Sequence, residues 1–181
     1  MTQFNYGDII KTNRIQYPIS KNEKEVNTMR IAIGSDPNAE SAKIELIKHI
    51  EKGGYGEVVD FGSPDPIYAN AAIQVAESVA KGEYDKGILI CGTGIGVSIA
   101  ANKVQGAYAA LVSDVYSAKR ACLSNDANII CMGAFTTGSK VREEMVDVFL
   151  THNFVPGCSS QPKVDAFVAY DMKSSGKMHK N

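Results

Sequence analysis

The stretch Gly87-Ile88-Leu89-Ile90-Cys91-Gly92-Thr93-Gly94-Ile95-Gly96 decides the fold. It begins with a short apolar run, continues through alternating glycines, and leads into small, helix-permissive residues that reach Lys103. This order is typical of a buried strand that turns directly into a helix. In open α/β sheets, ligands bind at the carboxyl ends of strands, where such turns lie. The stretch therefore predicts both an α/β fold and the position of a functional site.

Candidate strands and helices alternate along the rest of the chain. Strands are expected at 30–36, 58–62, 107–112 and 128–133, and helices at 37–52, 69–81, 115–123, 139–150 and 163–172. This alternation predicts a mostly parallel sheet of about five strands with helices on both faces. We expect one domain at 29–172, preceded by an extension at 1–28 and followed by a polar tail at 173–181.

The bulk composition excludes several classes of protein. The formal net charge of −1 gives no general attraction to nucleic acid or anionic membranes. No apolar run has the length of a membrane span, and the first residues lack the features of a signal peptide. The four cysteines form no C-x-x-C pair, and the three histidines are scattered. We therefore expect a cytoplasmic protein that has neither a metal site nor a cofactor and binds neither nucleic acid nor membrane.

Cys91 is the residue of the turn that indicates chemistry. A thiolate at a helix start can act as a nucleophile or as a base. The neighbouring glycine amides can approach a ligand closely and hold a developing oxyanion, and Thr93 adds a hydroxyl donor. A base beside an oxyanion site suits proton abstraction next to a carbonyl. The alternative is that Cys91 is a buried cysteine that packs as a small hydrophobic residue.

Other polar residues follow predicted strands or helices. Asp36 ends the first strand and is either a catalytic acid or base, or the cap of the next helix. Asn102 and Asn125 either contact substrate hydroxyls or cap turns. The segment 124–126 is expected to form a loop that reaches the same sheet edge as Cys91.

The glycines also admit a dinucleotide-binding interpretation, which their spacing does not support. The fingerprint G-x-G-x-x-G requires a third glycine, and Val97 or Ile99 occupies that position, depending on the starting glycine. The turn also follows the third predicted strand rather than the first.

Together, these motifs resemble the type B ribose-5-phosphate isomerase family, which also contains the galactose-6-phosphate isomerase subunits. The resemblance is carried by residues 31–36, 88–96, 100–104, 116–118 and 125–128. It implies a Rossmann-like three-layer α/β sandwich and a metal-free aldose–ketose isomerase. It also implies a homodimer, or a higher homo-oligomer, with shared active sites.

The resemblance also implies roles for individual residues. Cys91 would be the base that moves a proton between C1 and C2 of a sugar phosphate, assisted by Thr93 and Asp36. The remaining residues implied to bind substrate are Gly92, Gly94, Gly96, Asn102, Ser124, Asn125 and Lys163.

Several positions depart from the family pattern. The family has a histidine at Pro37 and Asp-Tyr-Pro where this chain has Pro64-Asp65-Pro66. Phe135 replaces an arginine, and Ser159 and Lys163 stand where arginines grip phosphate. The cations left to meet a phosphate are Lys163, Lys140, Arg142 and Arg14.

Ser124 occupies the position of the family histidine that opens the sugar ring. Serine cannot shuttle a proton near neutral pH as imidazole can. We therefore expect a short substrate that is acyclic or opens readily, such as a four-carbon sugar phosphate. The alternatives are a non-phosphorylated sugar, a requirement for a second, different subunit, or a sugar-binding or regulatory subunit with little or no activity.

Overall fold

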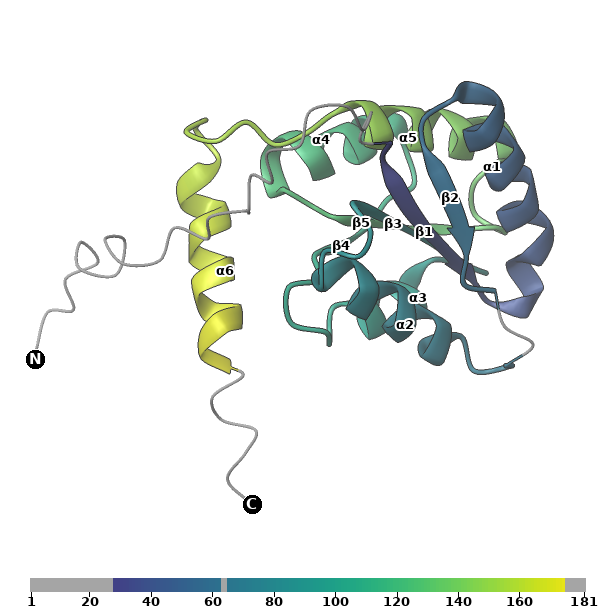
Figure 1. The fold of residues 1–181 in the computed structure, drawn as a ribbon, viewed down its shortest axis with the longest axis horizontal. Coiled ribbons are helices and arrows are strands. Elements are labelled where there is room, and N and C mark those ends of the chain that lie inside the picture. The colour runs from purple at the N-terminus through teal and green to yellow at the C-terminus, as the bar shows by residue number, and fades with distance from the viewer. Residues whose placement is uncertain (1–27, 63–64, 175–181) are drawn as a thin grey trace, which may run out of the picture.

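Five parallel strands form a sheet between two layers of helices in the computed structural model, which describes residues 28–62 and 65–174 (Figure 1). Most of the predicted extension, Pro64 and nearly all of the predicted tail lie outside these residues. The strands are β1 Arg30–Ser35, β2 Glu57–Asp60, β3 Lys86–Cys91, β4 Ala109–Leu111 and β5 Ile129–Gly133. The helices are η2 Pro37–Ala39, α1 Glu40–Gly53, α2 Tyr68–Ala80, α3 Ile95–Ala101, α4 Val115–Asn125, α5 Ser139–Thr151 and α6 Gln161–Ser174.

The strand order is β2-β1-β3-β5-β4, and every neighbouring pair is parallel. The chain leaves β1 toward β2 on one side and later adds β3 on the other side. The direction of strand order therefore reverses between β1 and β3. Ligands of open α/β sheets bind at this kind of switch point, outside the carboxyl ends of the strands.

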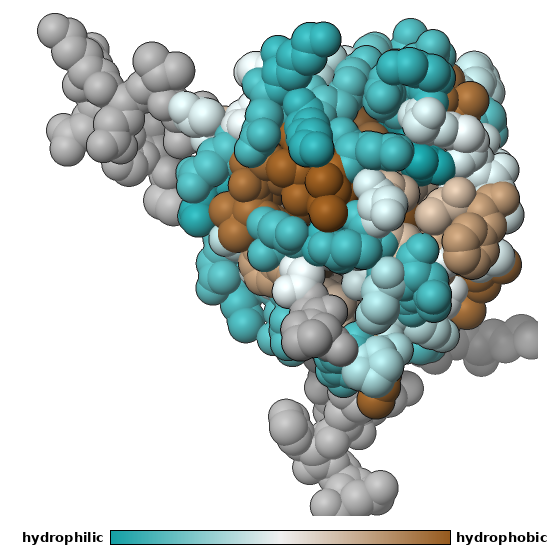
Figure 2. Space-filling model, turned by 90° about the vertical axis from the view of Figure 1, so that its right-hand side faces the viewer, coloured by the Kyte–Doolittle hydropathy of each residue, from teal (hydrophilic) through white to brown (hydrophobic). Residues whose placement is uncertain are grey.

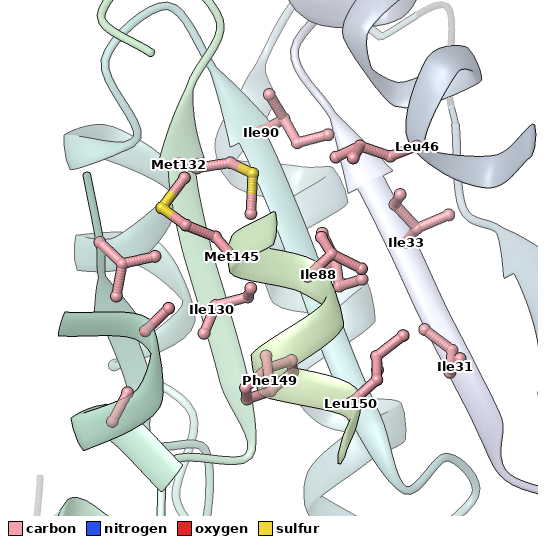
Figure 3. Packing of buried hydrophobic residues seen from close by; sticks show 14 of the residues in the cluster. Ile31, Ile33, Leu46, Ile88, Ile90, Ile130, Met132, Met145, Phe149 and Leu150 are labelled. Atoms are coloured by element: carbon pink, nitrogen blue, oxygen red, sulfur yellow. The ribbon is translucent and has the colours of Figure 1, made fainter. Parts of the chain in front are cut away.

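Both faces of the sheet are buried, as parallel sheets require. One face carries isoleucines of β1, β3 and β5 against α1, α4 and α5, and Figure 3 shows Met145, Phe149 and Leu150 of α5 packed there. The other face, which includes Leu89 and Cys91, packs against α2 and α3. The three-layer α/β prediction is therefore confirmed.

The last helix, α6, stands beside the body of the molecule (Figure 1). Its main contact is with α4, and Asp171 accepts hydrogen bonds from Gly106 N and the Tyr108 hydroxyl. No helix among residues 28–62 and 65–174 is long and apolar enough to cross a membrane.

Most element boundaries differ from the sequence predictions by one or two residues, and β4, α6 and α4 show differences that bear on the site. β4 is shorter than the predicted strand because the Ala107 and Tyr108 amides bond to Val104 O and Asn128 Oδ1 instead of a strand. α6 begins two residues earlier than predicted, at Gln161. α4 continues through the predicted polar loop to Asn125, and the left-handed Asp126 caps it with φ 49°.

Candidate active site

The ends of β1 and β3 bring Asp36 and Cys91 side by side. Ser35 pairs with Ile90, so one further step along both strands places Asp36 next to Cys91. The Asp36 amide also donates to Ile90 O at 2.8 Å. Two of the three predicted catalytic residues therefore meet at the switch point of the sheet.

Cys91 is buried, with 6% of its surface exposed, and its sulfur accepts a hydrogen bond. The Gly94 N–H donates to Cys91 Sγ at 3.1 Å. This bond fixes the sulfur against the glycine turn. The sequence predicted a set of amides facing a substrate; in the structure, one of these amides faces the sulfur itself.

The neighbouring cysteines have a different chemistry. Burial raises the pKa of Cys131, which lies on β5 near Cys91, far above its ordinary value. Burial also raises the pKa of Cys122 on α4. Both therefore remain neutral thiols that pack in the core, and Cys91 is the buried cysteine that has an amide donor on its sulfur.

The three glycines of the turn are enclosed by other parts of the chain. Gly94 has φ 80°, and a Cβ there would lie 2.8 Å from the backbone carbon of Met132. A Cβ on Gly96 would meet the ring of Tyr68 at 2.5 Å, and one on Gly92 would meet the ring of Phe135 at 3.0 Å. Glycine is therefore needed at Gly94, where both the conformation and the Met132 backbone exclude a side chain, whereas a Cβ at Gly92 or Gly96 would displace an exposed aromatic ring.

Tyr68 and Phe135 form apolar walls beside the cysteine turn, and both are exposed, Phe135 by 75%. In the space-filling view from the side on which β1 and β2 end, apolar residues gather in areas bordered by hydrophilic ones (Figure 2). Tyr68 was not among the site residues predicted from the sequence. Its position in the sequence could have indicated this role, because Tyr68 lies in the first turn of the helix that follows β2. That helix also begins at the carboxyl edge of the sheet.

Thr93 lies at the exposed tip of the turn, where its Oγ1 accepts a weak hydrogen bond from Ile95 N at 3.4 Å. Its hydroxyl hydrogen remains available to a ligand. Asp36 caps the short helix η2, since its Oδ1 accepts from Asn38 N at 2.8 Å. The capping role is therefore shown, while a catalytic role for Asp36 stays a prediction.

Lys43 is a buried cation near this edge, with 1% of its side chain exposed. Its Nζ lies 2.8 Å from carboxylate oxygens of both Glu40 and Asp60. Burial alone would lower the pKa of Lys43, but the two carboxylates raise it above its ordinary value. Because two carboxylates already neutralise it, Lys43 is not a free cation for a phosphate.

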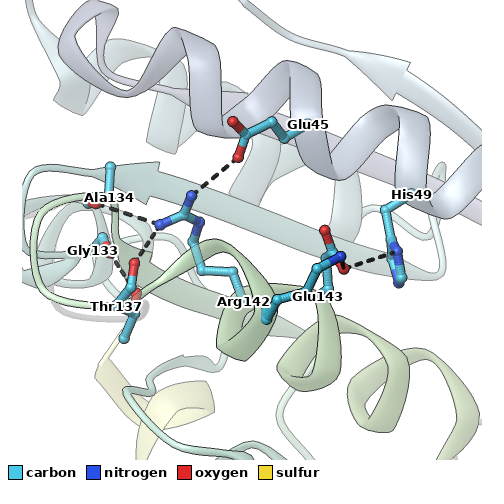
Figure 4. A network of polar contacts seen from close by, with 8 residues as sticks. Glu45, His49, Gly133, Ala134, Thr137, Arg142 and Glu143 are labelled. Carbon is cyan, nitrogen blue, oxygen red and sulfur yellow. Dashed lines mark hydrogen bonds and ion pairs between the residues drawn. The ribbon is translucent and has the colours of Figure 1, made fainter.

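Arg142 is also engaged by the protein. It is 7% exposed and donates to Ala134 O, Thr137 O and Glu45 Oε2. Figure 4 shows this network at the start of α5. The expectation that Arg142 is left to meet a phosphate is therefore not supported by its surroundings.

Ser124 and Asn125 are not at the edge of Cys91 within one chain. They end α4, and a helix of a βαβ unit returns the chain to the edge where the next strand begins. The next residue, Asp126, lies in a polar hollow of about 410 Å³ at that amino edge. The hollow is lined by Met29, Asp85, Lys86, Asp126, Ala127, Asn128 and Asn153. The length of β3, about 17 Å, separates the two edges, so the predicted convergence within one chain is wrong.

Asn102 also lies toward the amino edge, beside the first residue of β4. Its amide nitrogen donates to Ser98 O and Ala109 O, and its oxygen accepts from Ala109 N. These bonds cap the end of α3 and join it to β4, which agrees with the capping interpretation of Asn102. Lys163 is exposed in the first turn of α6, which packs on α4, and the structure does not bring it to Cys91.

Comparisons with known proteins match most of the described chain. The family described as Ribose/Galactose Isomerase matches residues 31–167. Ribose-5-P isomerase B of Listeria innocua is 43% identical over 149 residues, covering 81% of this chain and 99% of the relative. D-erythrulose-4-phosphate isomerase 2 of Mycolicibacterium smegmatis is 40% identical over 152 residues, covering 79% and 97%. The solved structure of Clostridium thermocellum ribose-5-phosphate isomerase B superposes with a TM-score of 0.75 at 38% identity, covering 81% and 99%.

Proposed function

The chain belongs to the ribose/galactose isomerase family, and we propose that it interconverts the aldose and ketose forms of a small sugar phosphate through a cis-enediolate. The observation that carries this proposal is the Gly94 N–H on Cys91 Sγ, with Asp36 beside the cysteine. This arrangement supports the proposal because it places a sulfur held by a backbone amide at the switch point of the sheet.

The proposed reaction moves one proton between two carbons of the substrate. The Cys91 thiolate removes the proton from C2 of the aldose, and the C1 carbonyl becomes the oxygen anion of the enediolate. The same thiol then returns a proton to C1, which leaves a carbonyl at C2. Asp36 and the Thr93 hydroxyl carry the matching proton between the two substrate oxygens. No atom is lost or gained, and Cys91 is a thiolate again at the end.

We further propose that two copies of the chain complete each site. Ser124, Asn125 and Lys163 lie away from Cys91 in one chain, so a substrate at Cys91 can meet them only from another copy. The position of α6 beside the body supports this arrangement, because its apolar residues Tyr170 and Met172 are exposed and a second copy could cover them. The second copy would also supply a cation for the phosphate, since Lys43 and Arg142 are already bound.

We propose a four-carbon substrate because no histidine among the described residues lies at the carboxyl edge of the sheet, where Cys91 lies. His49 lies between α1 and α5, bonded to Asp147, and His152 follows α5. Ser124, the residue at the family histidine position, accepts a hydrogen bond from Arg120. A four-carbon sugar esterified at its terminal hydroxyl cannot close a furanose ring, so it needs no ring-opening group. The Mycolicibacterium relative named for erythrulose phosphate supports this choice.

A substrate panel tests both the reaction and the substrate size. Four-, five- and six-carbon aldose and ketose phosphates are incubated with the protein in heavy water and followed by NMR. We expect deuterium at the carbon next to the carbonyl and turnover of a four-carbon substrate faster than that of ribose 5-phosphate. Faster turnover of ribose 5-phosphate would contradict the substrate proposal, and no exchange with any substrate would contradict the reaction. All four cysteines are free, which suits the reducing cytoplasm as the place of this reaction.

A further inference from the structure

The loop that follows β5 continues the sheet onto the cysteine turn. Ala134 N donates to Cys91 O at 2.8 Å, and Phe135 N donates to Gly92 O at 3.0 Å. These two bonds hold the backbone from which the Cys91 side chain and the glycine amides project. The conformation of the loop at 134–137 therefore sets the position of the proposed base.

Arg142 fixes this loop from the opposite side. Its Nη1 donates to the carbonyls of Ala134 and Thr137, and its Nη2 donates to Glu45 Oε2 of α1 at 3.2 Å (Figure 4). One side chain thus ties the loop to both α5 and α1. The Thr137 hydroxyl closes the loop further by donating to Gly133 O at 2.5 Å.

Arg142 makes these contacts as a buried side chain and not as a mobile side chain on the surface. The side chain is 8% exposed, whereas Glu45 is 55% exposed. The Arg142 Nε is buried without a hydrogen-bond partner among the described residues. A planar guanidinium reaches two carbonyls and a carboxylate at once, which a lysine ammonium on its single stem cannot do in this geometry.

We propose that Arg142 is a positioning residue of the cysteine turn, which it holds in place through the backbone of the loop at 134–137. The kinetic part of this inference rests on the proposed function, whereas the structural part does not. The two Arg142–carbonyl contacts and the two amide bonds to Cys91 and Gly92 form one continuous path to the proposed base. Arg142 itself touches no substrate.

The deciding experiment is amide hydrogen exchange in the full chain, measured by NMR for wild type, Arg142→Met and Arg142→Lys. Exchange at Ala134 and Phe135 is expected to accelerate in both variants, while exchange at Glu57, bonded to Met29 O at the amino edge, stays unchanged. Lysine keeps the charge, so Arg142→Lys carries the test if the methionine variant does not fold. Wild-type exchange at Ala134 and Phe135 in a folded variant would overturn the proposal.

The kinetic readout separates positioning from general loss of stability. A displacement of the base by about 1 Å lowers the rate about 100-fold, so we expect kcat of the Arg142 variants to fall by about 10- to 100-fold, with little change in KM. The control is Lys81→Met, which removes a cation that is 61% exposed and pairs with Glu77 on α2. A control that lost kcat equally would contradict the proposal. If the wild type has no isomerase activity, the proposed function fails, while hydrogen exchange still decides the role of Arg142.

Discussion

Replacing Gly94 by alanine tests the geometry on which the cysteine turn depends. Gly94 has φ 80°, and an added Cβ would lie 2.6 Å from Leu111 Cδ1 and 2.8 Å from the Met132 carbonyl carbon. The Leu111 side chain can move, but the Met132 backbone belongs to β5 and cannot yield without disturbing the sheet. The substitution therefore combines backbone strain with a clash against the backbone.

The two contributions can be estimated separately. A left-handed conformation at a non-glycine residue costs about 1–2 kcal/mol, and overpacking adds about 1–3 kcal/mol. The two ranges add to about 2–5 kcal/mol, and we expect Gly94→Ala to lower the free energy of unfolding by about 3 kcal/mol, within that sum. For a domain of this size, that loss lowers the Tm by about 6–12 °C.

Two other glycines provide matched controls in the same urea and thermal unfolding assays. Gly82 has φ 74° but nothing within 4 Å of an added Cβ, so Gly82→Ala measures the strain alone. Gly138 has φ −67° and open space around it, so Gly138→Ala should change stability little. A Gly94→Ala variant no less stable than Gly82→Ala would refute the reasoning from the clash with Met132.

Two further predictions concern charges in the fold. Burial, with the nearby Asp171 carboxylate, raises the pKa of Tyr108 to about 12 from its ordinary 10.0. Between these pH values the folded chain keeps a proton that the unfolded chain has lost, so stability should fall as the pH rises. Unfolding measured against pH should show a shallower fall in Tyr108→Phe, and equal slopes would contradict the assignment. Lys43→Met removes a buried cation between carboxylates that are 49% and 42% exposed and can rehydrate. Urea unfolding should therefore show a loss of only about 1–2 kcal/mol, less than for a fully buried pair, and a loss above that range would show that the carboxylates cannot rehydrate.

The alternation of apolar runs and amphipathic segments was enough to predict the layers of the fold. Residues such as Ile88 and Ile130, which are buried on one face of the sheet, belong to short apolar runs that the local sequence pattern already predicts to be strands. The pairing of Asp36 with Cys91 was also accessible, because both end predicted strands. Once the strand order shows that two parallel strands are neighbours, their carboxyl ends must lie side by side at one edge of the sheet.

The errors in the site have a common physical cause. Ser124 and Asn125 are polar residues near a helix end, and their polarity does not tell whether the helix has already returned to the amino edge. Asn102 bonds to β4, with which it shares no local pattern, so the sequence alone did not decide between its two interpretations. Tyr68 and Arg142 reach the cysteine turn only through contacts between elements distant in sequence, which a single sequence does not show.

The central claim is that Cys91 is the base that moves the substrate proton. The most direct test measures deuterium incorporation from heavy water into substrate by the wild type, by Cys91→Ser and by the control Cys158→Ser. Cys158 is also a free cysteine, but it lies in the segment before α6, away from the carboxyl edge. We expect Cys158→Ser to exchange like the wild type. We also expect Cys91→Ser to lose exchange while keeping its thermal stability, because a serine hydroxyl is far less acidic than a thiol. Exchange at the wild-type rate by Cys91→Ser would contradict the account.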